Sequence, residues 1–427
     1  MFAAILRARW GASQFPARSV RATQEPEGPT PLPGGPGPNP GLVLALWLAG
    51  GSFWLAADAA APPSSLLYTN YRFGNPPLSI HLVEVPRSNP QYEFHSVHAG
   101  GHALGLGPLS AQVALCQSMA GEPAAAINGD FYLREKAYAG APRGLQIVEG
   151  EVLNAPSGGP TFWIDVLGEP HVTNVVSRFQ VIWPDGRTTP FKLNGERKPN
   201  GVELYSLAVG KSTHTVGGRE FVLEGQGAGD WLPLRMGRTY SARVREVRAA
   251  GNTALAADIL VLSVGPAIVG QFGDLAAGAV LQISTASLPG LRGVRTAISG
   301  GPVLVREGKR QAMRASPGES YETSSMIERH PRTAIGWNEQ FFFLVEVDGR
   351  QRDLSVGMTL EELSRFLLKL GCENLLNLDG GGSATLWCQG EVRNSPCDGH
   401  ERPIANSLVV VSKALGSGGE AKTGGRQ

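Results

Sequence analysis

Short apolar or alternating runs, closed by Gly, Pro, Asn or Asp, make up most of the chain from Leu66 onward. Runs of this kind that end at turn-forming residues are typical of β-strands. Strands are therefore predicted to be the commonest element, and the clearest of them are Tyr92–Ala99, Ala124–Ile127, Ile259–Val264, Phe341–Val347 and Asn406–Ser412.

Two stretches have helical spacing instead. The first, Leu109–Ala120, stops at Gly121, a residue that commonly ends helices. The second, Thr359–Leu370, opens with Thr359 at the N-cap and Glu362 three residues later, which is the pattern of a capping box. Each is followed by a short apolar strand and a polar loop. We therefore expect an α+β fold, with a mixed β-sheet core, covering helices and a β-rich insertion.

The N-terminal 61 residues read as a leader. Residues 1–40 are basic and then rich in Pro and Gly, with no apolar periodicity. Residues 41–57 are apolar and are followed by small residues with A-x-A spacing, which is typical of an export signal. A single membrane anchor is the alternative, although the run is interrupted by Gly50 and Gly51 and is short for a span. The protein is therefore expected to be exported, to the periplasm or the extracellular space.

The remaining chain is expected to form one main domain at 62–413, ending in a disordered tail at 414–427. Within the domain, residues from about 163 to 250 are more polar and richer in turns, which predicts a β-rich insertion. No further membrane span is expected in this body. With 427 residues, the chain is long enough to build the core that an enzyme needs.

Composition excludes some classes of partner. The 38 Lys and Arg residues balance 37 Asp and Glu residues, so no global charge points to nucleic acid or to an anionic membrane. Any anion must be recognised locally. The chain has four cysteines, and an oxidising compartment permits disulfides. We expect Cys388 to pair with Cys397 across a turn, and Cys116 and Cys372 to be buried on or beside helices.

Several loops carry chemistry-bearing residues directly beside predicted strands. The glycines Gly380–Gly382 allow backbone N–H groups to approach a ligand closely, although a simple turn is the alternative explanation. Asp130 and Asp379 could equally be turn formers, His330 a surface residue and Arg332 half of a salt bridge. Their joint occurrence favours an acid/base and anion site. The loops read "INGDFY" from Ile127, "AISGGPVLV" from Ala297, "RHPRTAIGW" from Arg329 and "NLDGGGSATLW" from Asn377.

These loops, together with "VDGRQRDLSVGMTLEEL" from Val347 and "ERPIANSLVV" from Glu401, resemble in order the phosphodiester glycosidase family. The resemblance is dense from Ala297 onward and poor in the 163–250 region. It implies cleavage of the glycosidic bond of a sugar that is joined through C1 to a phosphodiester. The implied partner is such a carbohydrate phosphodiester, with no nucleic acid.

The chemistry of that reaction assigns roles to the candidate residues. The departing phosphate monoester needs charge neutralisation, which Arg332, His330 and Arg402 can supply. The oxocarbenium-like carbon needs a carboxylate as nucleophile or as base for water, and the candidates are Asp130 and Asp379, with Glu401 third. Asp348 and Arg350 are interpreted as structural. The cleft is expected to be lined by Ser299, Gly300, Gly301, Gly380, Gly381, Gly382 and Ser383, with Asn128, Asn377 and Asn406 binding hydroxyls.

Two other functions fit the same residues. One is a phosphodiesterase that cuts the P–O bond, with a divalent metal held by Asp130 and Asp379. The other is a non-catalytic glycan binder or exopolysaccharide assembly protein. The favoured hypothesis is an exported hydrolase acting on cell-envelope or exopolysaccharide glycans, for which no cofactor is required by the sequence.

Overall fold

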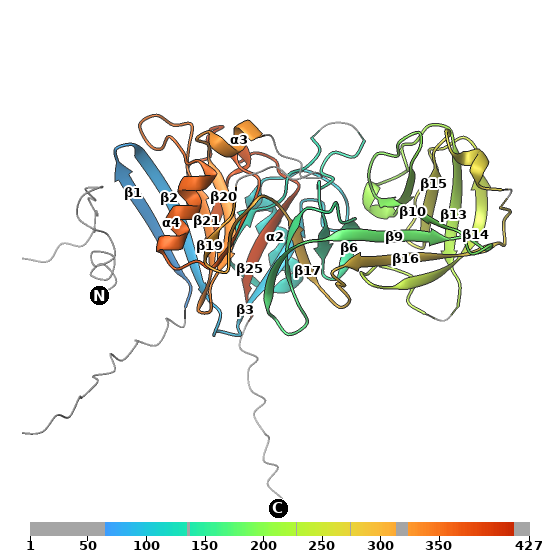
Figure 1. Cartoon of the computed structure of the whole chain (residues 1–427), viewed down its shortest axis with the longest axis horizontal. Coiled ribbons are helices and arrows are strands. Elements are labelled where there is room, and N and C mark those ends of the chain that lie inside the picture. The colour runs from blue at the N-terminus through green and yellow to red at the C-terminus, as the bar shows by residue number, and fades with distance from the viewer. Residues whose placement is uncertain (1–64, 135–136, 228, 274, 313–322, 414–427) are drawn as a thin grey trace, which may run out of the picture.

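The computed structural model describes residues 65–134, 137–227, 229–273, 275–312 and 323–413. The predicted leader and tail lie outside these residues. Strands grouped into four sheets dominate the described part of the chain (Figure 1).

The first sheet has seven strands, all paired antiparallel. Both of its faces are covered, so its central strands are buried on both sides and largely apolar rather than alternating. Phe342 and Leu344 face the core between sheets, while Phe343 and Val345 face a helix. The strand order is β1 (Leu67–Gly74), β2 (Pro77–Pro86), β21 (Phe341–Val347), β20 (Arg332–Trp337), β22 (Asn374–Asn377), β18 (Val303–Arg306) and β19 (Lys309–Arg310).

Two five-stranded sheets pack against the inner face of the first. Phe94, Ile127 and Phe162 from these sheets share one buried core with Leu344. The second sheet has the order β24 (Glu391–Val392), β23 (Leu386–Cys388), β4 (Glu122–Asn128), β25 (Asn406–Ser412), β3 (Tyr92–His98). The third has the order β6 (Glu151–Asn154), β5 (Gln146–Val148), β17 (Thr296–Ser299), β7 (Pro160–Ile164), β8 (Pro170–Asn174).

The fourth sheet has eight strands and its own apolar core, and it occupies one end of the molecule, green to yellow in Figure 1. Its strands run from Val176 to Leu288, so they extend beyond the 163–250 stretch that was expected to form an insertion. The order is β10 (Thr188–Pro190), β9 (Val176–Ile182), β16 (Val280–Leu288), β14 (Thr239–Arg248), β13 (Arg219–Gly225), β15 (Ile259–Val264), β12 (Val202–Tyr205), β11 (Lys192–Leu193).

Helices are few, and this corrects the predicted fold class. The described residues contain three α-helices: α2 (Leu109–Ala120), α3 (Thr323–Ile327) and α4 (Leu360–Lys369). Helix α4 covers the outer face of the first sheet and α2 packs on the second (Figure 1). The inner core, however, is formed by sheet against sheet. The expectation of an α+β fold with covering helices was therefore wrong, and the protein is mostly β.

The predicted helices themselves are present. Helix α2 spans the predicted residues, and α4 begins after Thr359 with both hydrogen bonds of the capping box in place. No helix in the described ranges is long and apolar enough to cross a membrane.

The predicted Cys388–Cys397 disulfide was wrong. Both are free thiols, as are Cys116 and Cys372. Cys388 is buried in β23, whereas Cys397 is partly exposed in the loop that follows β24. Cys116 is buried within α2 and Cys372 is buried just after α4, as expected.

Candidate active site

A cavity of about 670 Å³ lies where loops from several sheets meet. The loops follow β4 and β22, precede β20 and follow β21. Cationic side chains outnumber the carboxylates of Asp379 and Glu196 in its wall, so the cavity suits an anion. The arginines in the wall are Arg134, Arg143, Arg332, Arg350 and Arg402.

Asp379 is the predicted carboxylate that lines the cavity. It follows β22, and its backbone is fixed because its N–H donates to Gly129 O (2.9 Å) and its carbonyl accepts from Asn128 Nδ2 (2.7 Å). The side-chain Oδ1 accepts from Gly380 N at 2.9 Å. Burial raises the pKa of Asp379, although the Ser383 hydroxyl and the Gly380 N–H oppose the shift. A raised pKa makes this carboxylate a stronger base.

Asp130 lies close enough for its charge to interact with that of Asp379, but it is not part of the cavity wall. Its carboxylate is buried, and the two oxygens accept hydrogen bonds from Phe131 N and Gly144 N, both at 2.8 Å. Burial raises its pKa to about 7. The structure thus brings the two predicted aspartates together but gives only one of them access to the cavity.

Arg332 is a buried cation at the start of β20, 5% exposed, and it lines the cavity. Its guanidinium donates to three backbone carbonyls, those of Ser325 and Glu328 (both 2.6 Å) and Met358 (2.8 Å). Among the residues that the structure describes, no carboxylate forms an ion pair with it. Burial, and then the charge of Arg350, lowers its pKa to about 10. A buried guanidinium held only by neutral groups is suited to an anionic ligand.

His330 also lines the cavity, with two different neighbours. Its Nε2 is 3.2 Å from Glu328 Oε2, and its Nδ1 is 3.3 Å from Arg350 Nη2. Burial and the charges of Arg332 and Arg350 lower its pKa, so the neutral imidazole is favoured. Arg402 reaches the same cavity while its Nη2 pairs with Asp398 Oδ2 at 2.7 Å.

Glycine is required in the loop Gly380–Gly382 because neighbouring protein atoms leave no space for a Cβ, whereas the sequence predicted close approach of a ligand. A Cβ on Gly382 would lie 1.8 Å from Arg402 Nη2, and one on Gly380 would lie 2.6 Å from Pro331 O. Gly381 has a φ of +60°, and a Cβ there would lie 3.1 Å from Arg350 Nη2. The Gly381 N–H already donates to Pro331 O (3.0 Å). The triplet therefore makes room for two arginines and a backbone turn.

Several predicted ligand-binding groups are engaged within the protein. Asn128 Oδ1 accepts from Thr333 Oγ1 (2.6 Å), and Asn406 Oδ1 accepts from Asp130 N (2.8 Å). Both asparagines are buried and hold the loops that carry the aspartates. Asn377 lines the cavity, and its buried Oδ1 has no hydrogen-bond partner. Ser383 is buried beside Asp379, with which its hydroxyl interacts.

The "SGG" segment lies at the edge of the site. Ser299 is buried against Thr161, 2.8 Å between hydroxyl oxygens. The N–H groups of Gly300 and Gly301 donate to Pro160 O and Asn377 O, so they are occupied. Gly301 alone of these three residues is in the cavity wall.

Glu401 is placed away from the cavity wall. Its carboxylate accepts hydrogen bonds from Ser110 N (3.1 Å) and Ser110 Oγ (2.5 Å). A carboxylate there satisfies a free N–H of α2 and stabilises the positive end of the helix. These contacts indicate that Glu401 has a structural role.

Arg134, Arg143 and Arg350 belong to the cavity wall and were missed or misassigned by sequence reasoning. Arg350 was interpreted as structural, yet it contacts His330 in the wall. Arg134 and Arg143 lie in the loop after β4, on either side of a turn beyond Asp130. Their position within the loop that carries a candidate carboxylate was the signal available.

Comparisons with known proteins agree with the motifs. Residues 240–411 match the phosphodiester glycosidase family model. The bovine (Bos taurus) N-acetylglucosamine-1-phosphodiester alpha-N-acetylglucosaminidase is 34% identical over 113 residues, 25% of this chain. The SPbeta prophage-derived uncharacterized protein YomE of Bacillus subtilis (strain 168) is 30% identical over 120 residues, 28% of this chain. The matched segments make up only 20% and 18% of those relatives' lengths.

The fold has a counterpart among solved structures. A hypothetical protein from Synechocystis superposes with a TM-score of 0.64 at 21% identity, over 82% of this chain and 64% of that one. At this identity the likeness concerns the fold alone. The resemblance inferred from the motifs is confirmed by the family match, which covers His330, Arg332 and Asp379.

Proposed function

We propose, from the phosphodiester glycosidase match over residues 240–411, that this protein hydrolyses the glycosidic bond of a sugar 1-phosphodiester. The observation that carries the proposal is the pairing of a cationic cavity wall with the carboxylate of Asp379. Arg332 and Arg350 surround the space into which Asp379 faces. A neutral glycoside would leave this positive charge unmatched, whereas a phosphodiester oxygen would neutralise it.

In the proposed reaction, the bond between the anomeric carbon and the phosphate oxygen breaks, and its electron pair stays on the oxygen. A phosphate monoester leaves, and an oxygen from water ends on the sugar. Because the leaving group is already a good anion, arginines can stabilise it without a strong general acid. Asp379 stabilises the positive charge that develops at the anomeric carbon and takes up the proton of water, directly or through an intermediate.

Asp130 lies outside the cavity wall and stabilises the loop that follows β4. Both of its oxygens accept backbone N–H groups, which fixes the loop that carries Phe131 and Gly144. These bonds also argue against a metal-assisted phosphodiesterase centred on Asp130 and Asp379, because the Asp130 oxygens are directed at the backbone. We assign Asp130 a positioning role.

A substrate comparison tests the proposal. The purified chain is assayed with a sugar 1-phosphodiester and with a neutral aryl glycoside of the same sugar. We expect the phosphodiester to be preferred, and Arg350→Gln to reduce kcat/KM for it roughly tenfold or more, the effect of losing one charge-assisted hydrogen bond. Arg352→Gln, at an exposed arginine two residues away, is the matched control. Equal preference for the aryl glycoside, or an unaffected Arg350→Gln variant, would contradict the proposal.

We further propose that the enzyme acts after export, on cell-envelope or exopolysaccharide glycans. Support comes from the apolar segment at 41–57 and the small residues that follow it. Fractionation of cells that express the full chain checks this. Activity confined to the cytoplasm would contradict it.

A further inference from the structure

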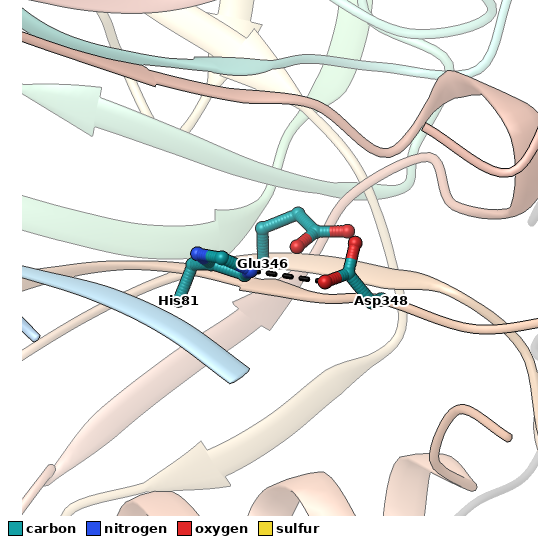
Figure 2. A group of neighbouring side chains, drawn as sticks. All are labelled: His81, Glu346 and Asp348. Atoms are coloured by element: carbon teal, nitrogen blue, oxygen red, sulfur yellow. Dashed lines mark hydrogen bonds and ion pairs between the residues drawn. The ribbon is translucent and has the colours of Figure 1, made fainter. Parts of the chain in front are cut away.

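A second group of ionisable side chains lies apart from the cavity wall, between β2 and β21. His81 pairs directly with Glu346 in the antiparallel register, and Asp348 follows two residues later. Since alternate residues of a strand share a face, all three project to the same side of the sheet. Figure 2 shows the two carboxylates and the imidazole directed toward one another. One ligand atom from each residue lies within 4.8 Å of the others.

The three side chains are buried at the interface between sheets. His81 is 2% exposed, Asp348 1% and Glu346 0%. They continue the rows of Val83 on β2 and Leu344 on β21, which belong to the inner apolar core. Polar side chains thus replace apolar ones at the end of a hydrophobic interface, where each uncompensated charge is costly.

Hydrogen bonds account for only part of the group. His81 Nε2 is 3.0 Å from Asp348 Oδ2, and His81 Nδ1 is 2.7 Å from the Tyr68 hydroxyl. Asp348 Oδ1 accepts from Ser395 N at 2.7 Å. Neither carboxylate oxygen of Glu346 has a hydrogen-bond partner. The Asn394 amide lies beside Glu346, and one of its two N–H groups donates to Ala384 O at 3.1 Å.

The unpartnered carboxylate is the feature that needs an explanation. Glu346 and Asp348 place two carboxylates side by side in a buried position, and two adjacent negative charges are costly there. A divalent cation would remove that cost, because its two positive charges match the two carboxylates. It would also bind the Glu346 oxygens, which accept no hydrogen bond of good geometry.

We propose that His81, Glu346 and Asp348 bind a divalent transition-metal ion, with Zn²⁺ as the best match. One imidazole nitrogen and two carboxylate oxygens form a donor set that zinc accepts, at bonds of about 2.0–2.2 Å. Such bonds place ligand atoms roughly 3–4 Å apart, a spacing compatible with a group that already lies within 4.8 Å. Ca²⁺ and Mg²⁺ are weaker matches, because they prefer oxygen ligands alone.

The ion would have a structural role toward the neighbouring cavity. Arg350 follows Asp348 by two residues, and Thr333, opposite Glu346 on β20, holds Asn128. Binding would therefore tie together β2, β21 and the segment that presents Arg350. This role does not depend on the proposed reaction, and its test does not use activity.

The test measures metal content and thermal stability of the purified chain. After treatment with EDTA, the protein is dialysed against Zn²⁺ and then against metal-free buffer, with Mn²⁺, Mg²⁺ and Ca²⁺ in parallel. We expect about one Zn²⁺ per chain by mass spectrometry and a higher Tm than in the EDTA-treated protein. Glu346→Gln, which preserves shape, should weaken Zn²⁺ binding by more than the roughly 10–100-fold expected for loss of an outer partner.

The matched control is Glu203→Gln, at a buried glutamate in the eight-stranded sheet that accepts a hydrogen bond from Gly195 N. It should bind Zn²⁺ like the wild type. The proposal is overturned if no divalent ion is retained, or if Glu346→Gln keeps both the stoichiometry and the rise in Tm. A Glu346→Gln variant that is more stable than the wild type, with no ion bound to either protein, would show that a proton neutralises Glu346.

Discussion

Asp130 and Asp379 each lie two residues after a strand that ends in asparagine, but their surroundings differ. Asp130 is enclosed and accepts two backbone N–H bonds, whereas Asp379 faces a cavity lined by arginines. Sequence reasoning could select both residues, because each lies in a loop of small polar residues after an apolar strand. It could not rank them, because access to the cavity depends on how other loops pack.

Replacing Asp379 by Asn should abolish turnover while leaving ligand binding largely intact. The change keeps the shape but removes the charge that stabilises the anomeric carbon, and we expect kcat to fall by on the order of 10²–10⁴. Steady-state kinetics and calorimetric binding measure the two effects. Asp165→Asn, in the turn between β7 and β8, is the control. Unchanged kcat in Asp379→Asn would remove this residue from the mechanism.

Asp130 should make stability depend on pH. Its pKa rises from an ordinary 3.8 to about 7 in the folded protein. The folded state therefore binds the proton more tightly, so this contribution to stability is complete below about pH 4 and is lost as pH rises through 7. Three pKa units correspond to about 4 kcal/mol.

The check is the difference in unfolding free energy between the wild type and Asp130→Asn, measured by urea titration from pH 4 to pH 8. We expect this difference to shift against the wild type by up to about 4 kcal/mol as pH rises. Taking the difference cancels groups common to both proteins, such as Glu203. A difference independent of pH would refute the assigned pKa.

At the scale of elements, the glycine triplet shows how a short loop positions larger groups. Gly382→Ala would push aside the end of the Arg402 side chain, which is flexible, whereas Gly380→Ala would meet backbone at Pro331. The first variant should fold almost normally but bind the phosphodiester more weakly. The second should lose stability. Gly380 is therefore expected to matter for stability, and Gly382 for substrate binding.

We expect Gly382→Ala to raise KM roughly tenfold or more, since a charge-assisted hydrogen bond contributes about 1.5–3 kcal/mol. Its Tm should stay near that of the wild type. Gly290→Ala, where a Cβ would meet no atom within 4 Å, is the control for both measurements. A Gly382→Ala protein with normal KM would show that Arg402 does not contact the substrate.

Helix α2 depends on a residue far away in the sequence. Its N-cap position is Pro108, which provides no side-chain hydrogen bond, and Glu401 takes that role through Ser110. Glu401→Gln should cost about 1 kcal/mol of stability and leave kcat within a few-fold of the wild type. Urea unfolding and kinetics measure the two. A loss of kcat as large as that of Asp379→Asn would restore Glu401 as a catalytic candidate.

For the whole molecule, local sequence patterns predicted individual strands and helices better than they predicted how the sheets pack together. The strands at Ile259–Val264, Phe341–Val347 and Asn406–Ser412 and the capping box at Thr359 are where periodicity and capping predicted them. The predicted fold class was wrong because the inner core forms where sheet packs on sheet, and such packing leaves no local pattern in the sequence. Very short strands such as β10 and β11 of the eight-stranded sheet have weak patterns, and their pairing depends on distant partners.

The site was predictable only in part for the same reason. Motifs placed Asp379, His330 and Arg332 beside strand ends, and the structure gathers them around one cavity. For Arg134, Arg143 and Arg350 the position in a loop was a weak signal, because a charged loop residue is usually exposed to solvent. The buried cluster of His81, Glu346 and Asp348 likewise arises from strand register, which joins residues 265 positions apart or more.

The proposed function depends on which bond is broken, and hydrolysis in ¹⁸O-labelled water measures this directly. A sugar 1-phosphodiester is incubated with the purified chain, and both products are analysed by mass spectrometry. We predict that the label appears in the free sugar and that the phosphate monoester carries none, because water attacks the anomeric carbon. Label in the phosphate would show cleavage of the P–O bond and would contradict the proposed function.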